Sequence, residues 1–557
     1  MPCSAWRNGH DAIHSISRGL LRVRTRSRTD WLLLAGFCGF LFFFGLAYFG
    51  LVGADEPRYA QVAREMLARH DWITPTLGGK PWLEKPPLYY WQAMLAYLIF
   101  GVSDSAARLP SAVDATLMIA AIYFFLKRFR PGFELDGALI TAAAAGVLGF
   151  ARSASTDMPL AAMFTISLLA WYAWHESESR RYLALAYFFL ALGMLAKGPV
   201  APALAAVIVT IFAVSKKDYA LIRKTLWLPG ILLFAAVALP WHVTVQMKNP
   251  EFFQVFIVQQ NFARFGTNLY RHAQPFWFYL PVILLGLVPW TVFMLAALGE
   301  TIRVWWAERR TMLQSESALN AFLVIWIAVP IVFFSISRSK LPGYILPTLP
   351  AGTLLLADYV RRRVTAGERP GLRLTILHSL VAAMPIVPAL MIQFIVLQHR
   401  LPRGALLAVS TGIALVLAIG MAATLRSRLG LGALRFVTLV PVVLSVAAIL
   451  RLGAPALDST LSARPLASEI NRLGPAALPL AIAHVSRQTE YGLAFYRNEV
   501  IARYESGQVP AGDHLLVMPE AYEATVEKEL AGRRFVTLDS SAAQRLNYYW
   551  VSAAPAR

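Results

Sequence analysis

Long apolar stretches recur along most of this chain of 557 residues and leave few folds open to it. A helix needs about 20 mainly apolar residues to cross the roughly 30 Å of hydrocarbon in a membrane. Hydrophobic residues make up 57% of the sequence and charged residues only 15%, whereas soluble domains average about 45–50% and about 25%. Because a chain in lipid must satisfy its backbone hydrogen bonds internally, the sequence predicts an all-α polytopic membrane protein and excludes a soluble globular one.

The first apolar stretch, at residues 31–52, follows a basic leader at residues 1–30 that we expect in the cytoplasm. The stretch is too long for the core of a signal peptide and lacks a cleavage site of small residues, so we expect it to remain as an anchor. Further stretches bring the expected number of spans to about thirteen. They lie at roughly 109–126, 136–151, 158–174, 181–196, 199–214, 227–246, 276–298, 318–336, 342–360, 373–397, 404–424 and 432–452.

Lysine and arginine residues gather in alternate connections between these stretches, as the positive-inside rule requires for cytoplasmic loops. The net charge of +20 is therefore explained by membrane topology, and nucleic acid is not an expected partner. The same alternation places residues 53–108 in one long external loop, although residues 86–100 are apolar. Since that segment is short and opens with two prolines, we expect it to lie along the outer interface as a helix.

The hydropathy falls after residue 452, which divides the expected transmembrane domain (31–454) from a C-terminal domain (455–557). Strand-like runs and one helical stretch predict that this second domain is a small α/β unit, and an odd number of spans places it outside the membrane in the periplasm. The strand-like runs are 478–485, 514–518, 535–538 and 548–551, and the helical stretch is 521–530.

Carboxylates stand beside two of the expected spans on the external side. Asp55 and Glu56 directly precede Pro57, and Asp157 lies at the mouth of another span. Each acid could simply cap a helix N-terminus, but a cap needs one acid and the first site has two. Because ionisable residues that converge at one membrane depth indicate a functional cavity, we expect Asp55, Glu56 and Asp157 to be catalytic.

Several external cations run against the positive-inside bias, which indicates that they bind an anion. Phosphate suits both arginine and lysine, whereas contacts with solvent or lipid headgroups are the alternative. Tyr344, in a Leu-Pro-Gly-Tyr corner, could donate to a phosphate oxygen or belong to an interfacial aromatic belt. The candidate substrate-binding residues are Arg58, Tyr59, Lys85, Tyr90, Arg264, Arg271, Lys340 and Tyr344, and the other external cations are Lys80 and Arg338.

A divalent cation (Zn, Mg or Mn) is only weakly indicated, and the sequence requires no cofactor. The carboxylates, together with His242 or His272, could hold one. However, the sequence contains no His-x-x-x-His motif and no cysteine cluster. Glu84 is the first ligand that we would expect in such a site.

Ordered motifs in roughly the first 350 residues resemble those of the integral-membrane GT-C glycosyltransferases, and among them the bacterial aminoarabinose transferases that modify lipid A. Related protein mannosyltransferases share the early acidic pair and the Arg-Leu-Pro motif. The motifs are Gly53-Ala-Asp-Glu-Pro-Arg-Tyr-Ala60, Lys80-Pro-Trp-Leu-Glu-Lys-Pro-Pro-Leu-Tyr-Tyr-Trp91, Arg108-Leu-Pro-Ser111, Thr156-Asp-Met-Pro-Leu-Ala161, Leu195-Ala-Lys-Gly-Pro199 and Ser339-Lys-Leu-Pro-Gly-Tyr-Ile-Leu-Pro347.

The resemblance implies a GT-C fold and transfer of 4-amino-4-deoxy-L-arabinose from undecaprenyl phosphate to lipid A phosphates, with inversion, at the periplasmic face of the bacterial inner membrane. Such a modification gives polymyxin resistance. By the same resemblance, Asp55 is the central acid and Asp157 its partner, while Arg58, Lys85 and Tyr344 hold the donor phosphate. The alternatives are a protein O-mannosyltransferase and, outside the enzymes, a lipid-linked-sugar transporter. A transporter would need ionisable residues across the bilayer midplane, whereas here the charges crowd one surface.

Overall fold

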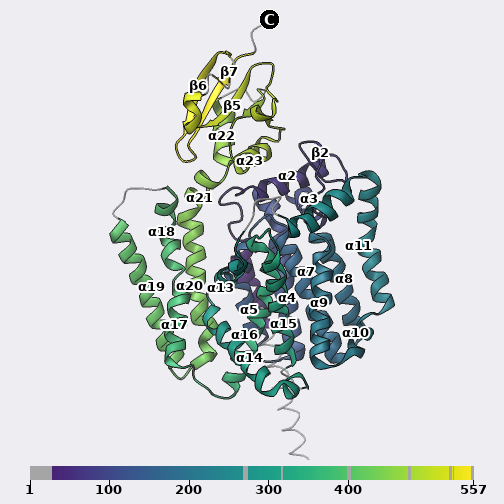
Figure 1. The fold of residues 1–557 in the computed structure, drawn as a ribbon. Helices are drawn as coiled ribbons and strands as arrows, with labels where there is room; N and C mark the ends of the chain where they lie inside the picture. The colour runs from purple at the N-terminus through teal and green to yellow at the C-terminus, as the bar shows by residue number, and fades with distance from the viewer. Residues whose placement is uncertain are drawn as a thin grey trace, which may run out of the picture.

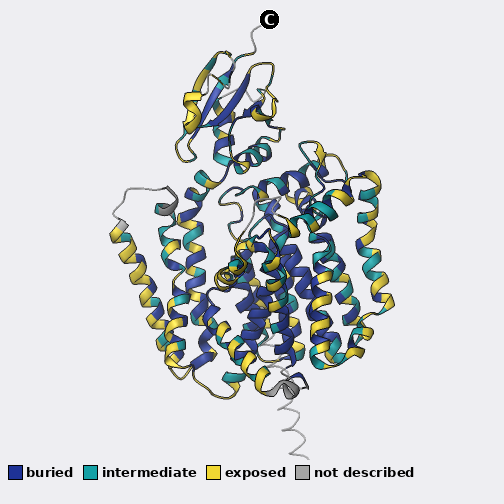
Figure 2. Ribbon diagram, viewed as in Figure 1, coloured by how far each residue is buried: buried dark blue, intermediate teal, exposed yellow. Residues whose placement is uncertain are grey.

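The computed structural model describes residues 28–267, 274–314, 318–397, 403–473, 478–525, 528, 530 and 532–553. A bundle of helices forms the larger part, and a small sheet with its own helices stands beyond one end of the bundle (Figure 1). Buried residues fill the centre of the bundle, and exposed residues are frequent on its outer helices (Figure 2). Large apolar side chains are among the exposed ones, including those of Met247 in α11 and Val416 in α19. Lipid, rather than water, suits such a surface, and the chain is a multi-pass membrane protein.

Six helical stretches in the described ranges are long and apolar enough to cross a membrane, and up to eight if two bent pairs each count as one span. The expected spans 136–151 and 276–298 are these bent pairs, and each is either a broken span or a re-entrant segment. The total of about thirteen stays a prediction. The six stretches are α4 (Asp104–Phe129), α11 (Leu228–Lys248), α15 (Ala318–Ile336), Leu372–Ile392 with α17 (Leu372–Ala383) and the start of α18 (Ile386–Leu397), Gly404–Arg426 in α19 (Arg403–Arg426), and Gly430–Leu461 with η5 (Gly430–Ala433), α20 (Leu434–Ala448), η6 (Ile449–Gly453) and α21 (Ala454–Leu461).

The two bent pairs break at angles of 66° and 117°. The first joins α5 (Glu134–Ala142) to α6 (Ala145–Ala151), and the second joins η3 (Phe276–Phe278) and α13 (Tyr279–Gly286) to α14 (Thr291–Gln314). The rest of the bundle consists of η1 (Gly39–Phe43), α7 (Asp157–Ser177), α8 (Arg180–Lys197), α9 (Val200–Lys216), α10 (Tyr219–Thr225), η2 (Phe253–Ala263), α12 (Arg264–Gly266), η4 (Pro342–Thr348) and α16 (Leu349–Thr365).

The long loop at 53–108 carries two helices, α2 (Asp55–Ala68) and α3 (Leu88–Phe100), joined through the hairpin of β1 (Thr76–Leu77) and β2 (Lys80–Pro81). Both helices lie at the end of the bundle that faces the sheet (Figure 1). Their apolar faces form one buried cluster that includes Tyr59 and Tyr90. With 13 residues, α3 is too short to cross the hydrocarbon, which agrees with an interfacial helix.

The C-terminal part forms a five-stranded mixed sheet in the order β4-β3-β5-β7-β6, with the first three strands parallel. All four strand-like runs contain strands, so the expected α/β character is confirmed. The expected helix at 521–530 is represented in the described residues by a 3₁₀ helix, and two α-helices were not expected. The elements are α22 (Arg464–Leu473), β3 (Leu480–Ile482), α23 (Arg487–Arg497), β4 (Ala502–Arg503), η7 (Tyr504–Ser506), β5 (His514–Pro519), η8 (Glu520–Thr525), β6 (Phe535–Ser541) and β7 (Leu546–Val551).

A buried ion pair between Arg108 of α4 and Glu56 of α2 ties the external loop to the bundle. The Arg108 side chain is 1% exposed, and its Nη2 and Nε lie 2.7 and 3.3 Å from the two carboxylate oxygens. Its other N–H groups donate to the backbone carbonyls of Leu46, Phe49 and Gly50, so all five are used. These three carbonyls belong to the segment between η1 and α2, which the arginine thereby holds in place.

Replacement of Arg108 by methionine should strongly destabilise the protein. Removal of one partner from a buried ion pair leaves an uncompensated charge and costs about 3–5 kcal/mol. The thermal unfolding of the purified protein in detergent should therefore occur at a clearly lower temperature. Arg472→Ala is the control, because Arg472 is exposed and pairs loosely with Glu469 at 3.4 Å; equal melting of the two variants would contradict the prediction.

Candidate functional site

Asp157 meets two other segments in the bundle. As the first residue of α7, it forms an ion pair with Lys197, the last residue of α8. A methyl group on Gly343 would lie 2.6 Å from Asp157 Oδ1, so the Leu-Pro-Gly-Tyr corner packs directly against this carboxylate. The N-cap is Thr156, without a side-chain cap bond, and Asp157 therefore does not act as the cap.

Three basic side chains gather around this carboxylate and the neighbouring Tyr344. The Lys197 ammonium lies 5.0 Å from the centroid of the Tyr344 ring, and the Arg264 guanidinium lies 5.9 Å from it. Lys85 lies within electrostatic reach of both cations. Burial, followed by repulsion from Arg264 and Lys197, lowers the pKa of Lys85 to about 7, although Glu84 and Asp157 act in the opposite direction. Such crowding of cations favours the binding of an anion.

Asp55 belongs to a second group, around Arg58. Asp55 opens α2, is 57% exposed, and pairs with Arg58 one turn later. The Arg58 guanidinium lies 5.1 Å from the ring centroids of Tyr59 and Trp82 and 5.6 Å from that of Tyr491. Three aromatic rings therefore hold this cation in position.

Tyr59 connects the two groups. The pKa of its buried phenol is raised, first by burial and then by the Asp55 carboxylate, with a smaller effect from Asp157. Both acids therefore act on one side chain. The hydroxyl of the fully buried Tyr90 and Nε1 of Trp82 have no hydrogen-bond partner among the described residues. A buried donor without a partner is costly, which favours a bound molecule here.

Glu56 has a different position from the other two acids. Besides the pair with Arg108, its oxygens accept the N–H groups of Val52 at 2.8 Å and Ala154 at 2.9 Å. These four bonds occupy the acceptor positions of the carboxylate. The geometry therefore favours a structural role for Glu56 over the expected catalytic one.

Not all the expected cations join the site. Lys340 donates to the carbonyls of Ser337 and Gln274, so its charge stabilises a loop. Lys80 and Arg338 are exposed, while Arg271 and His272 lie outside the described residues.

The divalent cation that the sequence weakly indicates stays a prediction. In the described ranges no three side chains of His, Cys, Asp or Glu gather in one place. His242 hydrogen-bonds the carbonyl of Ala238 at 2.8 Å and packs on Trp241. The Glu84 carboxylate interacts electrostatically with the cationic side chains of Arg58 and Lys85.

Sequence reasoning missed three residues of the site. Lys197 lies in the motif Leu195-Ala-Lys-Gly-Pro199 and is a cation at an external span end, a signal that could have identified it. Trp82 lies in the motif at 80–91. Tyr491 carried no sequence signal, because it reaches Arg58 only through the docking of α23 on α2.

Strong polar contacts hold that docked helix. The Tyr496 hydroxyl donates to Asp104 Oδ1 at 2.6 Å and accepts the N–H of Leu51 at 2.7 Å. Arg64 of α2 donates to the carbonyl of Phe495 at 2.6 Å. The C-terminal part is therefore joined to the candidate site rather than merely attached to the bundle.

The sequence is similar to a known group of transferases. The dolichyl-phosphate-mannose-protein mannosyltransferase family matches residues 84–243. The undecaprenyl phosphate-alpha-4-amino-4-deoxy-L-arabinose arabinosyl transferase of Pseudomonas aeruginosa (strain UCBPP-PA14) is 31% identical over 355 residues, which is 62% of each chain. That of Edwardsiella ictaluri is 31% identical over 340 residues, or 59% of each. The expected resemblance is confirmed, and the chain matches about three fifths of the length of these curated relatives.

The fold is also found in solved structures. ArnT from Cupriavidus metallidurans bound to undecaprenyl phosphate has a TM-score of 0.73 and 23% identity, covering 94% of this chain and 98% of that one. The apo state gives the same score at 22% identity. The chain therefore has the fold of ArnT over nearly its whole length.

The unusual environment of Lys85 can be tested by chemical labelling. The folded protein is acetylated at increasing pH, and peptide mass analysis measures the rate of acetylation at Lys85. This rate should reach half of its maximum near pH 7, because burial and two cations disfavour the ammonium form of Lys85. In the unfolded chain the midpoint should lie near about 10.4. Arg264→Gln removes one repelling charge and should raise the midpoint. The same midpoint in folded and unfolded protein would contradict the prediction.

Proposed function

We propose that the chain is a glycosyltransferase that moves 4-amino-4-deoxy-L-arabinose from undecaprenyl phosphate to phosphate groups of lipid A. The observation that carries the proposal is the gathering of Lys85, Lys197 and Arg264 beside Asp157 and Tyr344. The sequence similarity to arabinosyl transferases supports the sugar and the donor, and the ArnT structure with undecaprenyl phosphate supports a lipid-linked donor.

The three cations would bind the donor phosphate. As the glycosidic bond breaks, the sugar gains oxocarbenium character and negative charge grows on the departing phosphate. Cations already in position stabilise that charge without reorganisation, and loss of one such donor typically costs about 10²–10³ in rate. The Tyr344 hydroxyl would donate to a phosphate oxygen, since its ring lies beside Lys197 and Arg264.

An apolar cavity of about 340 Å³ next to this group suits the start of the polyprenyl chain. Its lining includes Phe150, Ile345 and Leu349 from α6, η4 and α16. Phe150 Cζ would lie 2.9 Å from a methyl group on Gly343, so the cavity adjoins the Asp157 carboxylate. Charge at one end and hydrocarbon at the other match a lipid phosphate.

The acceptor determines what the two acids do. A phosphate of lipid A is ionised near neutral pH and needs no general base, so Asp157 would orient the sugar and counter its cationic character. Asp55 is exposed beside Arg58, a position that suits contact with the sugar amine or with the incoming acceptor. Direct attack on the face opposite the leaving phosphate would invert the anomeric centre.

The location follows from charge and topology. About thirteen spans with cytoplasmic basic loops would place the leader in the cytoplasm and the site at the periplasmic face of the inner membrane. Lipid A modified there would carry extra positive charge and resist polymyxin. A second candidate, transfer of mannose to protein hydroxyl groups, has the match of residues 84–243 to mannosyltransferases in its favour. In that reaction Asp55 would act as the general base.

Mass analysis of lipid A from cells with and without the chain tests the proposal. The expected result is a mass increase of one aminoarabinose residue per modified phosphate. Asp55→Asn and Asp157→Asn should each abolish the increase while the protein is still made and inserted, because each removes a negative charge at the reacting sugar. If hexose were found on periplasmic proteins instead, the second candidate function would be favoured. If the Asp55→Asn variant modified lipid A as well as the wild type does, the proposed role of Asp55 would be contradicted.

The ring of Tyr491 should affect the positioning of the Arg58 guanidinium, and thereby substrate binding. A cation–π contact is worth about 0.5–2 kcal/mol, so Tyr491→Ala should raise the apparent KM by about 2- to 30-fold with a smaller change in kcat. Tyr491→Phe keeps the ring and should behave as wild type. Kinetics with purified enzyme measure both, and an equal loss in the two variants would show that the hydroxyl, not the ring, matters.

A further inference from the structure

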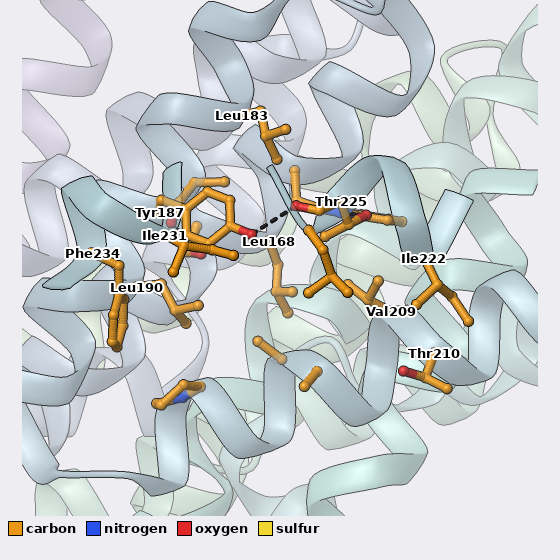
Figure 3. A pocket seen from close by; sticks show the side chains of 17 residues that line it. Leu168, Leu183, Tyr187, Leu190, Val209, Thr210, Ile222, Thr225, Ile231 and Phe234 are labelled. Atoms are coloured by element: carbon orange, nitrogen blue, oxygen red, sulfur yellow. Dashed lines mark hydrogen bonds between the residues drawn. The ribbon is translucent and has the colours of Figure 1, made fainter. Parts of the chain in front are cut away.

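A second, separate cavity of about 300 Å³ lies among α7, α8, α9, α10 and α11. Side chains such as Leu168, Leu190 and Phe234 point into it (Figure 3). Most of its polar groups already have partners: Tyr187 donates to the carbonyl of Thr225 at 2.7 Å, Ser167 donates to that of Ala186 at 2.8 Å, and Trp171 Nε1 donates to the Thr225 hydroxyl at 3.1 Å. An occupant of this cavity therefore needs no polar group inside it.

The dimensions fit a hydrocarbon chain. The lining extends along α9 from Pro202 to Thr210, which is about 12 Å at the helical rise of 1.5 Å per residue. The volume equals roughly ten times the share of one water molecule in the liquid. If this cavity were empty, the side chains that line it would lose dispersion contacts. The cavity also borders α11, whose outer residues are largely exposed apolar side chains.

Cations stand at the end of the cavity opposite the candidate site. Arg180, one turn before the lining residue Leu183, donates to the carbonyl of Lys224 at 3.4 Å, and its guanidinium lies 5.5 Å from the Trp227 ring centroid. Arg223 and Lys224 are exposed and directly precede the lining residue Thr225.

Acidic groups at this end are fewer than the basic ones and are already engaged. Glu178 lies 3.9 Å from Lys224, Asp218 accepts the N–H of Leu221 at the start of α10, and Glu176 pairs with Arg130 at 2.9 Å. The basic side chains of these connections are Arg180, Arg181, Lys216, Lys217, Arg223 and Lys224. The basic side chains therefore outnumber the acidic ones at this end of the apolar cavity.

We infer that this cavity binds an acyl chain of an anionic phospholipid of the bilayer, with the headgroup phosphate on Arg180, Arg223 and Lys224. Basic pockets between transmembrane helices are suited to acidic lipid headgroups, and arginine binds phosphate oxygens with charge-assisted hydrogen bonds. A neutral lipid would fill the cavity but would add no anion to balance the cations beyond Glu178, which lies 3.9 Å from Lys224. The lipid is distinct from the donor, because its headgroup lies at the opposite end of α8 from Lys197.

Thermal unfolding of the full-length protein in neutral detergent tests the inference. A ligand that binds only the folded state raises the unfolding temperature in proportion to its saturation. Phosphatidylglycerol should raise it in a concentration-dependent way, whereas phosphatidylcholine with the same acyl chains should have much less effect. Equal stabilisation by both lipids would overturn the headgroup assignment, and stabilisation by neither would overturn the site.

Two variants separate the chain from the headgroup. Ala205→Phe fills the cavity from α9 and should remove the effect of phosphatidylglycerol; Ala206→Leu is the milder form if the first variant does not fold. Arg180→Gln with Arg223→Gln should weaken the apparent affinity about tenfold or more. Arg428→Gln, an exposed cation in another connection, is the matched control and should respond as wild type. Native mass spectrometry of the same samples counts the bound lipid, and unchanged retention in Ala205→Phe would overturn the assignment to this cavity.

Discussion

The ion pair between Glu56 and Arg108 is the contact on which the external face of this protein depends. Glu56 directly follows Asp55, and it also accepts the N–H of Ala154, three residues before Asp157. The buried Glu56 carboxylate therefore makes hydrogen bonds close in the sequence to both Asp55 and Asp157, the two acids that we assign to the site. Because the arginine uses every N–H on this carboxylate and on the carbonyls of one segment, the loop has little freedom to move Asp55 away.

The cations of the candidate site repel one another, and a bound anionic substrate would reduce this repulsion. Lys85, Lys197 and Arg264 repel one another in a partly buried space, and the two nearby acids, Glu84 and Asp157, cannot neutralise all three. An anion between them would gain attraction from all three cations and restore the charged form of Lys85.

The C-terminal part contributes to this arrangement rather than standing apart from it. Its helix α23 places Tyr491 against Arg58, and the bonds of Tyr496 and Phe495 fix that helix on the bundle. At the other end of the bundle, the apolar cavity beside Arg180 contacts none of these residues. The two cavities that we propose for hydrocarbon thus have their charged partners at different ends of α8.

The sequence by itself determined the membrane class, the α/β character of the C-terminal part, and the long loop with its short apolar helix. It also supplied the candidates Asp55, Asp157, Arg58, Lys85 and Tyr344. These features follow from local properties: hydropathy over a helix length, alternation along strands, and charges that violate the membrane's preferences. Only the tertiary structure decided that Glu56 is bonded to Arg108, that Lys340 stabilises a loop, that two expected spans are bent, and that Lys197 and Tyr491 join the site. The physical reason is that a side chain's partner across 50 or 400 residues depends on how helices pack, and residue spacing within one segment carries no information about that packing.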